Sequence, residues 1–78
     1  QLLSADAKSS LQELLQERFN EGAEYVVVDE EGPAHARLFS IAVTFQGEEL
    51  GTGMASSKKE AEQQAARVAL AHLRRRRD

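Results

Sequence analysis

Apolar residues recur at helical spacing near the start of the chain. Between residues 7 and 19 they fall three or four positions apart, as on one face of a helix. These residues are Leu11, Leu14, Leu15 and Phe19. The polar face carries Ser9, Gln12, Glu13 and Gln16. Asp6 precedes the segment as an N-cap, and Gly22 follows it with the chemistry of a helix C-terminus. The pattern therefore predicts an amphipathic helix.

The middle of the chain follows the period of a strand. Residues 24–29 are rich in β-branched side chains, and apolar and polar residues alternate along 37–45. A third strand is predicted over 49–54, where two glycines indicate a bulge or the close approach of another backbone. Residues 30–35, which contain Gly-Pro, form a loop, and residues 46–48 form a tight turn. Such short connections predict an antiparallel meander.

Ser57 and Glu60 are spaced as a capping box, which places the start of a second helix at Lys58. This helix is predicted to run to about Arg74. Its apolar stripe consists of Ala61, Ala65, Ala66, Ala69, Leu70 and Leu73. Both helices must bury a stripe, and the sheet face that suits them carries Phe39, Ile41, Val43 and Phe45. The predicted fold is α+β, in the order α-β-β-β-α, with a three-stranded antiparallel sheet and both helices packed on one face.

The length of 78 residues indicates one domain. We expect residues 1–5 to be a linker remnant, 6–73 the folded domain and 74–78 an arginine-rich tail. Because the sequence begins with glutamine, we take it as a piece of a longer protein. It has no cysteine, no signal peptide and no apolar run of membrane-spanning length, so we expect a cytoplasmic protein without a membrane partner.

The formal net charge of -3 argues against a nucleic-acid partner until its distribution is considered. Basic residues gather at 58–59 and 74–77, and a local basic face can bind phosphate on an acidic chain. Lys58 and Lys59 lie in the first turn of a helix, where the free N–H groups already favour an anion. A solvated first turn is the alternative. The carboxylates of 29–31 point apart and lack a completing ligand, so they predict no metal site.

Several segments together resemble a double-stranded-RNA-binding domain. Lys58–Ala66 (KKEAEQQAA) is similar to the opening of its last helix, and Asp6–Gln16 (DAKSSLQELLQ) is similar to the first helix of the domain at the C-terminus of bacterial ribonuclease III. Tyr25, Gly32–His35 (GPAH) and Gly51–Gly53 (GTG) stand where that family has them. The resemblance extends from Asp6 to Leu73.

The resemblance implies three RNA-contacting regions. The first helix enters one minor groove, the loop reaches the next, and the start of the second helix holds phosphates across the major groove between them. The residues expected to bind RNA in these regions are Ser9, Gln12 and Gln16; Pro33, Ala34 and His35; and Ser57, Lys58 and Lys59. Such domains recognise mostly the shape of A-form RNA.

The sequence departs from the pattern of the family at two places. Met54 and Ala55 stand where many members have glycine or a basic residue, and Glu62 stands where many have a third lysine. The acidic residue is typical of the ribonuclease III branch. We therefore expect a low affinity for RNA from this domain alone.

The expected function is shape-selective binding of double-stranded RNA. The resemblance implies a parent ribonuclease III that cleaves duplex RNA with Mg²⁺, through an N-terminal domain absent here that could also form a homodimer. For this chain we expect no catalytic residue, no metal and no cofactor. The alternative is a protein-interaction module of the same fold. A hydrolase would need a nucleophile–base pair or metal ligands, and a single-strand binder would need aromatic stacking platforms; the sequence favours neither.

Overall fold

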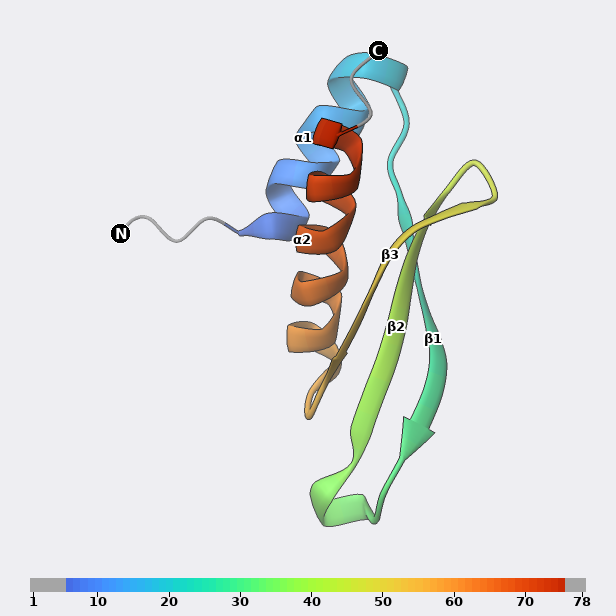
Figure 1. The fold of residues 1–78 in the computed structure, drawn as a ribbon, viewed down its shortest axis with the longest axis vertical. Coiled ribbons are helices and arrows are strands. Elements are labelled where there is room, and N and C mark those ends of the chain that lie inside the picture. Colours follow the sequence, from blue (N-terminus) through green and yellow to red (C-terminus); the bar gives the residue numbers. More distant parts are fainter. Residues whose placement is uncertain (1–5, 76–78) are drawn as a thin grey trace.

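The computed structural model describes residues 6–75, so the expected linker at 1–5 and the end of the expected tail lie outside the described residues. The elements are α1 (Ala7–Phe19), β1 (Glu24–Glu31), the 3₁₀ helix η1 (Ala34–Ala36), β2 (Leu38–Phe45), β3 (Glu48–Ala55) and α2 (Lys58–Arg75). Both helices lie side by side on one face of the sheet (Figure 1). The α-β-β-β-α fold predicted from the sequence is confirmed.

The helix termini are set by short polar side chains. Asp6 caps α1, since a carboxylate oxygen accepts from the Lys8 N–H at 3.2 Å. The Ser57 hydroxyl caps α2 by accepting from the Glu60 N–H at 3.2 Å. The predicted C-terminal stop of α1 at Gly22 was wrong. Asn20 ends the helix in the left-handed conformation, at φ 60°, which asparagine tolerates because its short polar side chain bonds locally.

The sheet has the strand order β1-β2-β3, with both pairs antiparallel. β1 is two residues longer than predicted, because Glu30 and Glu31 pair with the start of β2 and leave a shorter loop. The register of β1 against β2 shifts between Val27 and Asp29, which leaves Val28 without a partner residue in the ladder. β2 begins at Leu38, one residue later than predicted.

The two glycines of β3 let α2 lie directly on the strand. A Cβ atom at Gly51 would stand 2.6 Å from the carbonyl oxygen of Ala65, and one at Gly53 would stand 2.7 Å from the Ala65 nitrogen. The predicted close approach of another backbone is confirmed. The buried alanines of α2, among them Ala61 and Ala69, pack in the same contact between α2 and β3. Small residues on both sides therefore fix how α2 is placed on the sheet.

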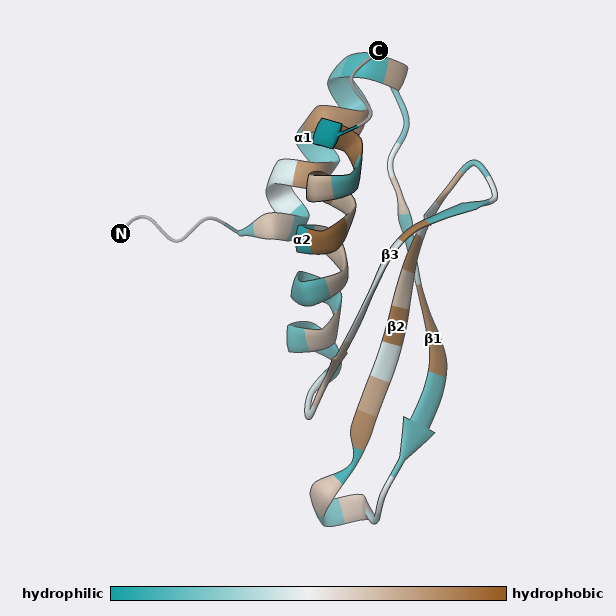
Figure 2. Ribbon diagram, in the orientation of Figure 1, coloured by the Kyte–Doolittle hydropathy of each residue, from teal (hydrophilic) through white to brown (hydrophobic). Residues whose placement is uncertain are grey.

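The core lies between the helices and the inner face of the sheet. Its fully buried large side chains are Leu11, Leu15, Ile41 and Val43. The most hydrophobic residues of α2 lie beyond its first turns, which are mainly hydrophilic (Figure 2). Phe19, which we predicted to be part of the buried stripe, is 48% exposed because it stands in the last turn of α1. Its ring packs on Phe45 at a centroid distance of 5.1 Å.

Candidate nucleic-acid interface

The first turn of α2 presents Lys58 and Lys59 to solvent, as the sequence predicted. Their backbone N–H groups belong to the first turn, where a helix provides no intrahelical acceptor. Ser57 lies at the same place, and its hydroxyl oxygen accepts from the Glu60 N–H. Its role in the structure is therefore that of a cap.

A pocket of about 350 Å³ joins the β1–β2 loop to the start of α2. Its lining residues include Ala34, His35 and Lys58 from the predicted site. The Lys58 ammonium lies 5.6 Å from the centroid of the Phe39 ring, a cation–π geometry. The fold thus brings together two of the three expected contact regions. Pro33 is exposed at the N-cap of η1 and does not line this pocket.

Two residues of this pocket escaped the sequence analysis. Arg37 forms an ion pair with Glu30, its guanidinium nitrogen 3.0 Å from the carboxylate oxygen. Phe39 was assigned to the buried face of β2, but it is only half-buried because its end of the strand extends past the start of α2. The sequence held one signal of this partial burial, namely the separation of Phe39 from the predicted start of the second helix. Arg37 and Phe39 line this pocket beside the expected RNA-contacting residues, although the sequence analysis did not include them in the expected site.

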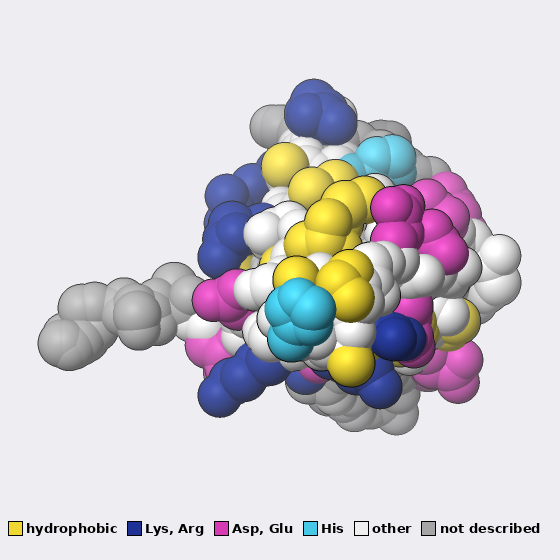
Figure 3. All heavy atoms as spheres, turned by 90° about the horizontal axis from the view of Figure 1, so that it is seen from below, with side chains coloured by type: hydrophobic (Ala, Val, Ile, Leu, Met, Phe, Trp, Pro, Cys, Tyr) yellow, Lys and Arg dark blue, Asp and Glu magenta, His cyan; other side chains and the backbone are white. Residues whose placement is uncertain are grey.

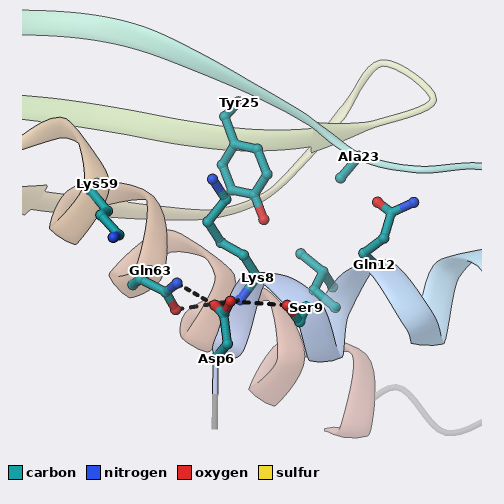
Figure 4. A pocket seen from close by; sticks show the side chains of 9 residues that line it. Asp6, Lys8, Ser9, Gln12, Ala23, Tyr25, Lys59 and Gln63 are labelled. Atoms are coloured by element: carbon teal, nitrogen blue, oxygen red, sulfur yellow. Dashed lines mark hydrogen bonds between the residues drawn. The ribbon is translucent and has the colours of Figure 1, made fainter. Parts of the chain in front are cut away.

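A second pocket, of about 360 Å³, lies between the first turns of α1 and α2 (Figure 4). Ser9, Gln12 and Lys59 all line it, so a phosphate candidate stands beside two minor-groove candidates. Gln16 does not line this pocket. Its amide nitrogen donates to the Asn20 side-chain oxygen at 3.0 Å, farther along α1.

Lys8 and Tyr25 form one wall of the second pocket, and the sequence analysis gave Lys8 no role. The Lys8 ammonium lies 5.0 Å from the Tyr25 ring centroid and 2.5 Å from a carboxylate oxygen of Glu62. Glu62 was expected to weaken RNA binding, because it stands where many members of the family have a third lysine. In the structure it is paired across the two helices. Burial, followed by the negative charges of Glu62 and Asp6, raises the pKa of Tyr25 to about 12.

Gln63 fastens the start of α1 to α2. Its side-chain oxygen accepts from the Ala7 N–H at 2.9 Å, and its side-chain nitrogen donates to the Asp6 carboxylate. This amide, together with the Ser9 hydroxyl, lowers the pKa of Asp6 because both stabilise the charged carboxylate. Gln63 is another residue that the sequence analysis missed, since its partners lie more than fifty positions away.

Charges are separated over the surface. Seen from the end that carries the β1–β2 loop, lysine and arginine side chains gather mainly on the helix side, and acidic side chains mainly on the sheet side (Figure 3). The net charge of -3 therefore hides a face that can attract phosphate.

The described part of the chain shows neither a metal cluster nor a helix suited to a membrane. Within residues 6–75, no three histidine, aspartate or glutamate side chains come together as a metal ion would require. Neither helix described here is long and apolar enough to cross a membrane.

Comparisons with known proteins match this geometry. The family model described as double-stranded RNA binding motif matches residues 7–73. Ribonuclease 3 of Desulfotalea psychrophila is 59% identical over 69 residues, which cover 88% of this chain and 29% of that protein. Ribonuclease 3 of Pelotomaculum thermopropionicum is 50% identical over 68 residues, covering 87% and 28%.

A solved structure gives the same result. Dicer from Pichia stipitis matches with a TM-score of 0.69 and 34% identity, over 88% of this chain and 34% of that one.

The chain spans less than a third of the length of the ribonucleases it matches. The match of 7–73 nevertheless includes both helices up to Leu73 and all three strands. The chain belongs to the double-stranded RNA binding motif family.

Proposed function

We propose that this chain binds double-stranded RNA by the shape of the A-form duplex. One observation carries the proposal: each lysine at the start of α2 shares a pocket with a different minor-groove candidate. Lys58 lies with His35, and Lys59 lies with Ser9 and Gln12. An A-form duplex offers phosphates across its narrow major groove, flanked by two shallow minor grooves lined with 2′-hydroxyls. The side chains follow the same order, since the two lysines lie between His35 on one side and Ser9 and Gln12 on the other.

The parent protein is proposed to be a ribonuclease III, in line with relatives named Ribonuclease 3. In this proposal a further domain cleaves the duplex with Mg²⁺ and forms a homodimer, and the protein works in the cytoplasm. The present chain holds the substrate. The residues argued above are proposed to contribute binding and placement of the duplex.

A protein-interaction function is the second candidate. It is favoured by apolar side chains exposed on the sheet, such as Val28 at 58% and Met54 at 50% exposure. The acidic residues on the sheet side also suit a partner other than RNA (Figure 3). The two candidate functions differ in the role of Lys58 and Lys59, which only RNA binding requires. The following experiment separates the two functions.

The test is a titration with a duplex RNA of about 20 base pairs at low and moderate salt, beside matched duplex DNA and single-stranded RNA. We expect salt-dependent binding to duplex RNA alone. Replacing Lys58 and Lys59 together by alanine should weaken binding strongly and reduce the salt slope by about two, roughly one per phosphate contact. Unchanged affinity, with the fold intact by circular dichroism, would refute the proposed phosphate contacts.

The matched control replaces Arg67 and Arg74 by alanine. Both are exposed on α2, and the change removes the same charge away from the first turn. We expect a smaller loss than from the lysine pair. Equal losses would indicate a general charge effect, and no binding of the unaltered chain to any nucleic acid would favour the protein-interaction function.

A further inference from the structure

The two helices are held in the fold by different contacts. The β3 glycines bring the α2 backbone against the sheet, where a Cβ atom at Gly53 would stand 2.7 Å from the Ala65 nitrogen. α1 packs on α2 and buries Leu11 and Leu15, which both lie beyond its first turn. Within that first turn only Ala7 is buried. Apolar burial therefore holds the start of α1 less firmly than the turns that follow it.

The Gln63 side chain supplies polar contacts at this place. It is half-buried on α2 and reaches from that helix toward Asp6 (Figure 4). Its oxygen accepts from the Ala7 N–H at 2.9 Å and from the Lys8 N–H at 3.4 Å, and its nitrogen donates to the Asp6 carboxylate. The first N–H groups of a helix have no intrahelical acceptor. A single amide on α2 thus bonds the N-cap and the first residues of α1.

These bonds are made by a neutral side chain, which distinguishes them from the other polar contact between the two helices. The Lys8–Glu62 ion pair joins the same turns, but both of its side chains are partly exposed. Salt therefore weakens the ion pair, whereas the hydrogen bonds of Gln63 involve no charge on that residue and depend much less on salt. The start of α1 keeps this attachment over a range of salt concentrations.

Gln63 also lines the pocket in which the proposed RNA contacts of the two helices meet. Ser9 and Gln12 reach it from α1, and Lys59 reaches it from α2. The separation between these groups depends on how the first turns of the two helices are placed. An A-form duplex has a fixed separation between its minor-groove hydroxyls and the phosphates across its major groove. A protein that holds the matching separation before binding avoids the cost of ordering these groups.

We propose that Gln63 is a positioning residue that sets the spacing between the α1 contacts and Lys59, so that the free protein already fits the A-form duplex. The inference rests on the proposed binding of double-stranded RNA. Gln63 acts through Ser9 and Gln12, by fixing the turn that carries them, and not as a phosphate contact. Without its bonds this turn has to be ordered during binding, and we expect the affinity for RNA to fall on the order of three- to tenfold.

The test compares Gln63→Met with Gln64→Met in the duplex RNA titration at several salt concentrations. Methionine keeps the length of the side chain and removes both the donor and the acceptor. Gln64 is the matched control, because it is also half-buried on α2 and its oxygen accepts a backbone N–H, that of Met54 on β3, at 3.1 Å. We expect the three- to tenfold loss with an unchanged salt slope for Gln63→Met, and a loss below about twofold for Gln64→Met.

A second comparison separates positioning from a general loss of stability. When Ser9 and Gln12 are already alanine, Gln63→Met should weaken binding by less than about twofold. In a Lys58→Ala background, which alters the other pocket, the full loss should persist. Destabilisation of the whole fold would act equally in both backgrounds. Circular dichroism checks the fold, and Gln63→Asn, which stays polar but is one methylene shorter, replaces the methionine variant if that one is unfolded.

Three outcomes would overturn the inference while leaving the proposed function standing. They are an unchanged affinity of Gln63→Met, an equal loss from Gln64→Met, and a loss that persists in full without the Ser9 and Gln12 side chains. In each case the unaltered chain still binds the duplex. Failure of the unaltered chain to bind duplex RNA would instead reject the proposed function itself.

Discussion

Lys8 and Glu62 form an ion pair between the first turn of α1 and the second turn of α2, with 2.5 Å between ammonium nitrogen and carboxylate oxygen. The Lys8 ammonium also lies over the Tyr25 ring. Both charged side chains remain partly exposed, so the pair adds only about 0–1 kcal/mol to the free energy of unfolding. We propose that its larger effect is on the pocket it borders, where Glu62 would compete with an RNA phosphate for the Lys8 ammonium.

Glu62→Gln should therefore raise the affinity for duplex RNA. The change frees the Lys8 ammonium and removes a negative charge from a surface that faces phosphates. We expect a gain on the order of threefold at low salt and a salt slope steeper by about one. The measurement is the same duplex titration at several salt concentrations.

Two further variants decide whether Lys8 is responsible. In a Lys8→Met background, Glu62→Gln should give a much smaller gain. Glu31→Gln makes the same charge change at the end of β1, away from α1, and should have little effect. A similar gain from Glu31→Gln would show that net charge alone is at work.

Phe39 should hold Lys58 in position for phosphate. Phe39→Leu keeps an apolar side chain at this half-buried site but removes the ring face under the ammonium. A partly exposed cation–π contact is worth about 0.5–1 kcal/mol, so we expect RNA affinity to fall two- to fivefold. The loss should vanish in a Lys58→Ala background. A full loss persisting there would mean that Phe39 acts on the loop or the fold instead.

Gly22→Ala should alter RNA binding while leaving the fold nearly unchanged. The added Cβ would lie 2.8 Å from the side-chain oxygen of Gln12, and its nearest contacts all belong to that flexible side chain. The amide has to rotate, at a cost below about 1 kcal/mol in the free energy of unfolding. We expect a two- to fivefold weaker affinity for RNA, by loss of about one hydrogen bond. No further loss should appear when Gln12 is already alanine.

Gly53→Ala also adds a single methyl group, but it should destabilise the fold. The added Cβ would meet the backbone of α2 at Ala61 and at the Ala65 nitrogen, and that helix cannot yield as a side chain does. Overpacking of this kind destabilises by about 1–3 kcal/mol. Urea unfolding should show the decrease for Gly53→Ala and little for Gly22→Ala. Equal stability of both variants would contradict the close packing of α2 on β3.

Tyr25 should make the protein less stable in alkali. Its pKa is about 12 in the folded protein, against an ordinary value of 10.0 for tyrosine, chiefly because burial disfavours the phenolate. The folded state therefore keeps the proton longer than the unfolded state does. The associated stabilisation is complete below pH 10 and is lost as the pH rises toward 12. Because solvent reaches the half-buried ring, the loss is on the order of 1 kcal/mol.

The chain has a single tyrosine, so its ultraviolet absorbance reports this titration directly. Tyr25→Phe should lack this part of the alkaline loss. Glu62→Gln should lower the tyrosine pKa, since the carboxylate of Glu62 is the second cause of the shift. A midpoint near pH 10 in the folded protein would contradict the burial of the phenol.

Local patterns in the sequence determined the elements and part of the site. The capping residues Asp6 and Ser57 and the alternation of β2 specify structure within a few residues of themselves, so their outcomes matched the predictions. The lysine pair at 58–59 was likewise fixed by its position after a cap. The end of α1 was predicted less well, because Asn20 and Gly22 can both follow a helix and the backbone conformation selects between them.

Only the tertiary structure decided how the site residues are combined. The partners of Lys8 and Asp6 on α2 lie 54 and 57 positions away, beyond the reach of any local pattern. Packing α2 onto the β3 glycines sets the distance between the helices, and this distance lets Glu62 and Gln63 reach the start of α1. The sequence alone thus determined which side chains we propose to contact RNA. The packing decided which of them share a pocket.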